Sequence, residues 1–368
     1  MQRIIKNLYK LQKPLLFKQD PEKIHEKTLS LGEKLGKFHP TKKLISLSLN
    51  YTHPYLENSL LGIKFKNPIG LAAGFDYEAK LIEILPALGF GFHTIGSITF
   101  KPYEGNKPPR LTRLVKSKSI LVNKSLKNSG AENILSRIKN TKREIPLGIS
   151  IAKTNSRETC SLKSGIQDYI NCFKTAEKYK IASYYELNIS CPNAFGGEPF
   201  TTPQKLNPLL KKIDKLKIKT PIFLKMPIDL SLKETFELCD TAAQHNIQGL
   251  IFGNLTKNRK NKFLNKEELK KAGKGAFSGL PTRELSNNLI KHTFKRYKSR
   301  FVIVGCGGVF SAEDAYEKIT LGASLIQLIT GLIFNGPQLV SEINHNLVKL
   351  LKKHGFNSIK QAIGSRNR

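Results

Sequence analysis

Short apolar segments alternate with amphipathic segments from residue 68 to near the end of the chain. The apolar segments have the length and composition of buried strands, and segments such as 168–179 and 232–244 have helical spacing. Eight strands are expected: Ile69–Ala73, His93–Ile98, Leu147–Ile151, Tyr184–Ile189, Ile222–Met226, Gly249–Phe252, Val302–Gly305 and Leu325–Ile329. This alternation predicts an α/β fold, a (β/α)8 TIM barrel. A doubly wound sheet competes, but the strand count and the lack of GxGxxG after the first strand favour the barrel.

The N-terminal region has a different pattern. Residues 2–17 place apolar side chains at helical spacing between Lys and Arg, and Pro14 is expected to break or kink this helix. Asp20 and Pro21 are typical of a helix start, and a second apolar face runs over residues 24–35. Such short amphipathic helices could lie on a membrane, form a hydrophobic slot or cap the barrel.

The organisation of the remaining N-terminal residues follows from these patterns. Residues 44–59 are expected to form a connector, and residues 60–66 a short hairpin that leads into the barrel. We therefore divide the chain into an N-terminal helical extension, residues 1–45, and a barrel, residues 46–368.

Composition constrains the partners more than the fold. The 368 residues carry a net charge of +33, which favours nucleic acid or an anionic membrane surface as a partner. The alternative is a lysine-rich proteome, because Lys is spread along the whole chain. The five cysteines form no CxxC pair and no metal-ligand spacing, which suits a reducing compartment. No apolar run reaches the roughly 18 residues of a membrane span, and no signal-peptide core is expected at the N-terminus.

Polar and glycine residues follow the predicted strands. In a barrel of this type the carboxyl ends of the strands form the active site, so these residues are expected to converge. The glycine-rich ends of the seventh and eighth strands are where such barrels usually hold a phosphate. The strand ends are 72–74, 96–97, Lys153, 188–193, Lys225, 253–254, 305–308 and 330–331.

Two of these strand ends indicate chemistry. Lys225 would be buried, and a buried ammonium needs a negative charge nearby, such as that of a reduced flavin; the alternative is a lysine that extends out of the barrel mouth. The stretch 185–197, YELNISCPNAFGG, presents two amides, a hydroxyl and a thiol within six residues. These groups could recognise a small planar polar molecule and move a proton on it, although a strand followed by a proline-stiffened turn is also consistent with the pattern.

Eight motifs together resemble dihydroorotate dehydrogenase, and most closely its quinone-linked class 2. They are KNPIGLAAGFD (66–76), GFGFHTIGSIT (89–99), GNKPPRLTRL (105–114), ELNISCPN (186–193), LKMPIDLS (224–231), FSGLP (277–281), VGCGGV (304–309) and ITGLIFNGP (329–337). They span nearly the whole barrel in order. The stretch 13–28 is also similar to the class 2 extension, whose two helices contact the membrane and frame a quinone tunnel.

The resemblance implies a flavin enzyme of pyrimidine biosynthesis. Flavin mononucleotide (FMN) would be its cofactor, dihydroorotate its substrate and a membrane quinone its acceptor, and Cys191 would be the catalytic base, with Lys225 beside the flavin. The other expected cofactor contacts are Ala73, Gly74, Ser97, Ser150, Asn188, Gly253, Gly279, Gly308, Ile329 and Thr330. The expected orotate contacts are Asn123, Asn188, Asn193 and Asn254. The resemblance also implies that residues 1–40 contact the cytoplasmic side of the cell membrane as a peripheral attachment. No specific nucleic acid is expected as a partner.

The chain departs from the family pattern at several of these positions. Class 2 normally has Ser as the base, whereas Cys at position 191 is the class 1 pattern; a thiol, with an ordinary pKa of about 8.5, loses a proton more readily than a hydroxyl. Tyr77 stands where the family has a substrate-contacting Lys, and the stretch 123–130, NKSLKNSG, is one residue shorter than the family's NRMGFNNxG and lacks its internal Gly. Lys124 or Lys127 could supply the missing charge.

Three alternatives remain open at this point. One is a class 1-type dihydroorotate dehydrogenase with a soluble acceptor. Another is an FMN-dependent tRNA dihydrouridine synthase, which shares the barrel and a catalytic Cys and would suit the charge of +33. The third is a non-catalytic barrel that keeps its flavin.

Overall fold

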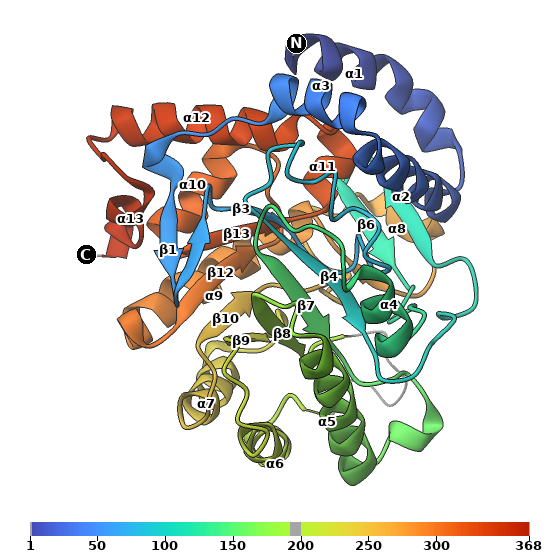
Figure 1. Cartoon of the computed structure of the whole chain (residues 1–368), viewed down its shortest axis with the longest axis vertical. Coiled ribbons are helices and arrows are strands. Elements are labelled where there is room, and N and C mark those ends of the chain that lie inside the picture. Colours follow the sequence, from blue (N-terminus) through green and yellow to red (C-terminus); the bar gives the residue numbers. More distant parts are fainter. Residues whose placement is uncertain (1, 192–199, 368) are drawn as a thin grey trace.

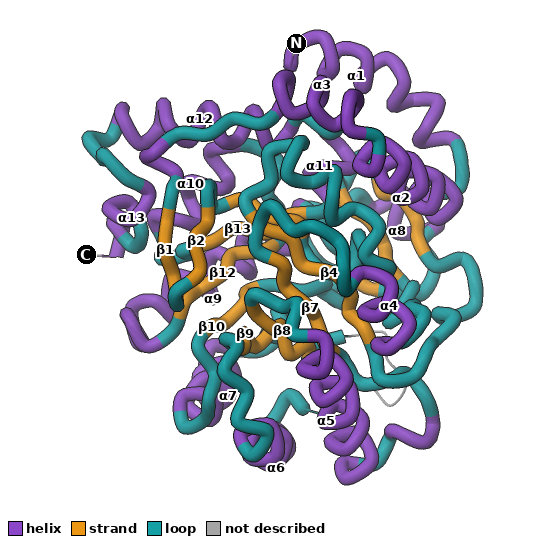
Figure 2. The backbone as a smooth tube through the Cα atoms, in the orientation of Figure 1, coloured by secondary structure: helices purple, strands orange, loops and turns teal. Residues whose placement is uncertain are grey.

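The computed structural model describes residues 2–191 and 200–367, and its centre is a closed barrel of eight parallel strands (Figures 1 and 2). Each strand pairs with the next barrel strand in the sequence, and the last pairs with the first. The predicted barrel is therefore confirmed, with all eight expected strands in it. They are β3 (Ile69–Leu71), β4 (Phe92–Ile98), β7 (Leu147–Ile151), β8 (Tyr184–Asn188), β9 (Ile222–Lys225), β10 (Gly249–Phe252), β12 (Val302–Cys306) and β13 (Leu325–Leu328).

Helices surround the barrel because its strands are buried on both faces and their outer side chains need cover. The expected helices at 168–179 and 232–244 are present as α5 (Leu162–Tyr179) and α7 (Leu232–Ala243). A capping box at Ser231 and Glu234 begins α7. The other helices after the first barrel strand are α4 (Ala131–Ile138), α6 (Pro203–Asp214), α8 (Lys266–Lys271), α9 (Arg283–Tyr297), α10 (Ala312–Thr320), α11 (Thr330–Asn335), α12 (Leu339–Lys353) and α13 (Ile359–Ala362).

The inside of the barrel is filled in layers, since alternate residues of each strand point inward. Phe92, Tyr184 and Phe223 form the lower layer, together with Phe65 from the hairpin of β1 (Asn58–Leu60) and β2 (Ile63–Phe65). That hairpin is the one expected at residues 60–66. Two residues further along their strands, Thr94 and Glu186 hydrogen-bond to each other at 2.8 Å. The next inward positions reach the open carboxyl end.

Three helices precede the hairpin and lie over the carboxyl end of the barrel: α1 (Gln2–Lys18), α2 (Pro21–Lys37) and α3 (His39–Leu49) (Figure 1). The predicted start of α2 is confirmed, because Asp20 Oδ1 accepts a hydrogen bond from the Lys23 amide and Pro21 is the first helical residue. The predicted break at Pro14 is wrong. The helix continues to Lys18, and Phe17 beyond the proline packs edge-on against Phe334 at 5.4 Å.

The connector predicted for residues 44–59 is wrong in its first part, which belongs to α3. This helix has no acidic residue in its first turn and no side-chain cap, and its stability comes from packing, with Leu49 buried. A second sheet was not predicted. It contains β5 (Leu111–Leu114), β6 (Ser119–Val122) and the short β11 (Ala276–Phe277), all antiparallel, and β5 packs against α2.

Candidate active site

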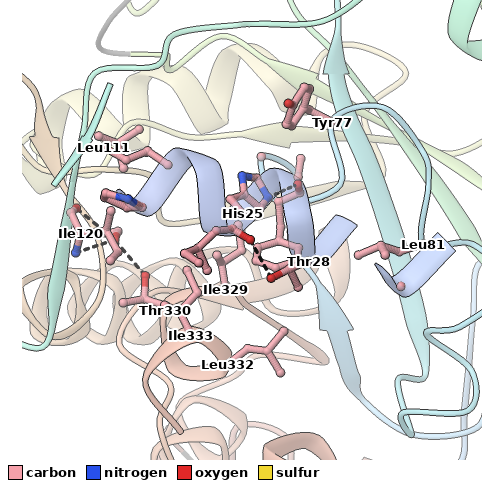
Figure 3. Close-up of a pocket in the computed structure, with 18 of the residues that line it drawn as sticks. His25, Thr28, Tyr77, Leu81, Leu111, Ile120, Ile329, Thr330, Leu332 and Ile333 are labelled. Atoms are coloured by element: carbon pink, nitrogen blue, oxygen red, sulfur yellow. Dashed lines mark hydrogen bonds between the residues drawn. The ribbon is translucent and has the colours of Figure 1, made fainter. Parts of the chain in front are cut away.

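A cavity of about 710 Å³ lies at the carboxyl end of the barrel. Its floor is formed by strand ends and its outer wall by α1 and α2, so two regions of very different polarity line one space. Figure 3 shows lining residues from two parts of the chain. His25 and Thr28 come from α2, and Ile329, Leu332 and Ile333 come from the segment that follows β13.

The structure brings most of the predicted site residues to this cavity. The residues that line it are Ala73, Gly74, Ser97, Asn188, Cys191, Lys225, Asn254, Ile329 and Thr330. Five others do not line it: Asn123, Ser150, Gly253, Gly279 and Gly308. The first four adjoin or hydrogen-bond to residues that do. Asn193 lies outside the described residues.

The end of β8 is fixed by a chain of hydrogen bonds. Asn188 Nδ2 donates to Ser97 Oγ at 2.8 Å, and Ser97 Oγ lies 2.8 Å from Ser150 Oγ. The Asn188 carbonyl accepts from the buried Tyr169 hydroxyl at 2.7 Å. Ser150 therefore holds Ser97 from behind instead of lining the cavity, because a serine side chain is too short to extend past it. These contacts leave Asn188 in one orientation beside Cys191.

Asn254 approaches from the end of β10. Its Nδ2 donates to both the carbonyl and the Oγ of Ser190 at 2.8 Å, while its Oδ1 accepts from the Leu255 amide. Asn254 and Asn188 thus both contact Ser190, which is 2 % exposed. Two carboxamides are thereby placed on either side of the turn that carries Cys191.

Lys225 lies at the end of β9, the strand next to β8. Its backbone pairs with Asn188 in the parallel register, and the residue is only 5 % exposed while lining the cavity. Burial of an ammonium favours an anionic or electron-rich neighbour. The predicted burial of Lys225 is confirmed, and the alternative of a side chain extended into solvent is wrong.

Gly279 and Gly308, which do not line the cavity, both have positive φ and pack closely against other protein atoms. Gly279 has φ +75°, and a Cβ there would lie 2.3 Å from the Lys118 carbonyl oxygen and 2.8 Å from Thr330 Cγ2. Thr330 Oγ1 in turn donates to Ser278 Oγ at 2.8 Å (Figure 3). Gly308 has φ +70°, and a Cβ would lie 2.4 Å from Arg283 Cβ. Only glycine fits either position, so these two turns can approach Lys118 and Arg283 closely.

A dihydroorotate dehydrogenase family model matches residues 55–351 of the chain, which includes every barrel strand. The chain belongs to the dihydroorotate dehydrogenase family. The dihydroorotate dehydrogenase (quinone) of Nostoc punctiforme is 35% identical, over 95% of this chain and 96% of its own. The enzyme of that name from Mycobacterium tuberculosis is 31% identical, over 98% and 99%. The predicted class 2, quinone-linked membership is thereby confirmed.

Solved structures agree with this assignment. A dihydroorotate dehydrogenase of Eimeria tenella in complex with ferulenol has a TM-score of 0.82 to this chain at 26% identity, covering 95% of this chain and 96% of that one. Its ligand-free form has a TM-score of 0.83 and is covered completely. Both matches cover 95% of this chain. They favour dihydroorotate dehydrogenase over the tRNA dihydrouridine synthase alternative.

Two residues that line the cavity, His25 and Lys124, have lowered pKa values. The sequence analysis did not name His25 as a site residue, and it left the role of Lys124 open. His25 on α2 lies with Nε2 2.8 Å from the Phe75 carbonyl oxygen, and burial lowers the pKa of His25 to about 4, aided by the nearby Lys124 ammonium. The ring is therefore neutral at pH 7 and donates from Nε2. Lys124 is also buried, which lowers its pKa to about 8. The sequence motif of residues 13–28 contains His25, but nothing in it reveals contact with Phe75.

Proposed function

We propose that this chain oxidises dihydroorotate to orotate at a bound FMN and passes the electrons to a membrane quinone. The proposal rests on one observation: a continuous cavity is lined both by the polar strand ends and by the apolar faces of α1 and α2. Two substrates of opposite polarity need such a space if they react at one cofactor from different sides. A steady-state assay with dihydroorotate and a short-chain quinone tests the activity, and formation of orotate without quinone consumption would contradict it.

The residues present fit FMN. Gly74 lines the cavity with φ +109°, and a Cβ there would have only Ile329 Cδ1 within 4 Å, so a ligand can approach the backbone closely. Thr330 also lines the cavity and would contact the phosphate. Lys225 would lie beside the isoalloxazine, where its ammonium stabilises negative charge of the reduced ring. A bound FMN would supply the hydride acceptor and the means of passing electrons on singly or in pairs.

The substrate is proposed to lie against Asn188 and Asn254, with Asn123 and Asn193 completing the set of amides. Carboxamides both donate and accept, which suits the alternating C=O and N–H groups of a pyrimidine ring. Cys191 would remove the proton from C5 as hydride leaves C6, so the two hydrogens depart as a proton and a hydride and a C5=C6 double bond forms. Asn188 and Asn254 orient the ring for this step.

The quinone would enter between the N-terminal helices. Their contribution to the cavity is mainly apolar and includes Ile5, Leu16, Ile24, Leu31 and Leu35. Leu31 is 57% exposed although it lines the cavity, and Thr28 beside it is exposed as well. These residues mark the opening of the cavity toward the outside.

The outer faces of the same helices are proposed to contact the cytoplasmic side of a membrane. They carry most of the exposed large apolar side chains among the described residues: Ile4, Leu8, Leu11, Leu15, Leu31, Phe38, Leu44 and Leu47. A patch of this kind, flanked by lysines, is typical of an interfacial surface. No described helix is both long and apolar enough to cross a bilayer. The contact surface includes α3 and thus extends beyond residue 40.

Replacing Leu11 or Leu47 by Asp should weaken vesicle binding. These side chains are 75% and 79% exposed, so the substitutions cost the fold little but each removes about 1 to 3 kcal/mol of membrane burial, or roughly a fivefold to hundredfold loss of affinity. Flotation with phosphatidylglycerol-containing vesicles measures the effect. Leu162→Asp, at an exposed apolar position on α5, is the matched control. Equal loss in the control would contradict the proposed surface.

Replacing Gly279 by Ala should lower the FMN content of the purified protein. The added Cβ meets Lys118 and Thr330, so both must move away from the site. Gly355→Ala is the matched control, because Gly355 has nearly the same φ, +73°, and no atom within 4 Å of the added Cβ. Both variants should lose about 1 kcal/mol of stability from backbone strain, and Gly279→Ala should lose more because of its contact with Lys118 and Thr330. Only Gly279→Ala should lose flavin, measured as the ratio of flavin to protein absorbance.

A further inference from the structure

The ammonium of Lys124 is buried and lacks a hydrogen-bond partner among the described residues. Its side chain is 8% exposed and lines the cavity directly after Asn123, at the end of β6. The nearest carboxylate oxygen, Glu22 Oε1, is 3.9 Å away, which is too far for a hydrogen bond. A buried ammonium that has only a distant carboxylate and no hydrogen-bond acceptor is costly, and its presence in a ligand cavity points to an anion that the ligand supplies.

The ring of Tyr77 holds this ammonium in place. Lys124 Nζ lies 3.8 Å from the ring centroid, within the range of a cation–π contact. Such a contact stabilises the charge but supplies no oxygen or nitrogen acceptor to its three N–H donors. A ligand carboxylate would supply one.

The other cations that line the cavity are already engaged. Arg113 donates to the Phe17 and Gln19 carbonyls between α1 and α2. Lys127 pairs with Glu26 at 3.0 Å and is 22% exposed. Lys225 lies at the end of β9, where the proposed flavin ring needs it. Lys124 is the remaining cation among the described lining residues.

Charge counting around Lys124 leaves one positive charge unbalanced. The groups that face it are the carboxylates of Glu22 and Glu26 on α2 and the cations Arg110 and Lys127. Glu22 is shared, since it also lies 3.2 Å from Arg110 and 3.5 Å from Lys127. Three cations against two carboxylates give a net charge of +1. One bound carboxylate would neutralise the cluster.

We propose that Lys124 binds the carboxylate of dihydroorotate and orotate, and thereby selects this substrate over pyrimidines that lack the group. The inference rests on the proposed function and adds a specificity residue to the same site. It also chooses between Lys124 and Lys127, because Lys127 already has a carboxylate partner.

The pH dependence of binding follows from the position of Lys124. Burial lowers its pKa to about 8, with Lys127 and Arg110 acting in the same direction and Glu22 and Glu26 opposing them. A bound carboxylate favours the charged form, so binding requires the protonated amine. Orotate affinity should therefore fall as pH rises above about 8, approaching tenfold per pH unit.

The test compares the binding of orotate and uracil to the FMN-loaded protein by calorimetry. Uracil has the same ring without the carboxylate. Lys124→Met should weaken orotate binding by about 10- to 100-fold, the effect of losing a charge-assisted hydrogen bond, and change uracil binding by less than about twofold. The fall in orotate affinity above pH 8 should disappear in this variant. Lys127→Met, at the neighbouring ion-paired lysine, should retain both affinities.

Three results would overturn the assignment. Orotate affinity that is unchanged in Lys124→Met would exclude the contact. Equal losses for orotate and uracil would show a distorted pocket, and loss in Lys127→Met alone would move the carboxylate to that residue. A different result would contradict the proposed function itself. In that case the wild-type protein would bind neither compound, and dihydroorotate would not reduce its flavin.

Discussion

Replacing Cys191 by Ala slows reduction of the bound flavin by dihydroorotate by about two to four powers of ten, the usual contribution of a general base. The methyl group cannot accept the C5 proton, while Asn188 and Asn254 still hold the ring in place. Flavin content and orotate affinity should stay within about twofold of wild type, because neither depends on proton removal. Anaerobic stopped-flow measurement of the flavin absorbance gives the rate.

The control for this result is Cys160→Ala. Cys160 is exposed on the loop after β7, so its loss should leave the rate unchanged. Cys191→Ser tests the chemistry further. A hydroxyl is a weaker acid than a thiol, so this variant should be slower than wild type but faster than Cys191→Ala. A rate in Cys191→Ala equal to wild type would remove the thiol from the mechanism.

Deletion of residues 1–40 abolishes quinone reduction while dihydroorotate still reduces the flavin at nearly the full rate. The deletion removes α1 and α2, which form the apolar wall of the cavity, and leaves the strand ends intact. The two half-reactions are measured separately, by stopped flow with dihydroorotate and by reoxidation with a quinone. Quinone reduction at the full rate in the truncated protein would contradict the proposed entrance.

A single substitution tests the same entrance without removing the helices. Thr28→Trp places a large ring at the opening, and reoxidation by a long-chain quinone should slow by about tenfold or more, since a displacement near 1 Å can cost a hundredfold. Lys27→Trp, one position along α2 and outside the cavity lining, is the control. Flavin reduction should be unchanged in both. Equal slowing in the two variants would indicate a general effect on α2.

The barrel could be predicted from the sequence because each of its strands is buried on both faces. Such strands appear in the sequence as short apolar runs. The predicted ends of all eight strands lie within two residues of the observed ends. The second sheet could not be recognised in the same way. Residues 111–113 of β5 are half-buried and β11 has two residues, so neither gives a continuous apolar run. Helix α3 was missed because it has no side-chain cap and no acidic residue in its first turn, and because it depends on packing.

The site was predictable only where a motif marks it. The strand-end rule and the family resemblance together named Asn188, Cys191, Lys225 and Thr330, and all four line the cavity. Contacts between distant segments carry no such signal. His25 and Phe75 are 50 positions apart, and nothing in either sequence stretch indicates that they meet. The choice between Lys124 and Lys127 likewise required the positions of Glu22 and Glu26.

Anaerobic titration of the purified, FMN-loaded protein with dihydroorotate tests the central claim most directly, since it depends on cofactor, substrate and chemistry at once. We expect the yellow colour to bleach with one equivalent of dihydroorotate per flavin, with orotate formed in equal amount. A colourless protein, or a flavin that stays oxidised in excess dihydroorotate while a chemical reductant bleaches it, would contradict the account.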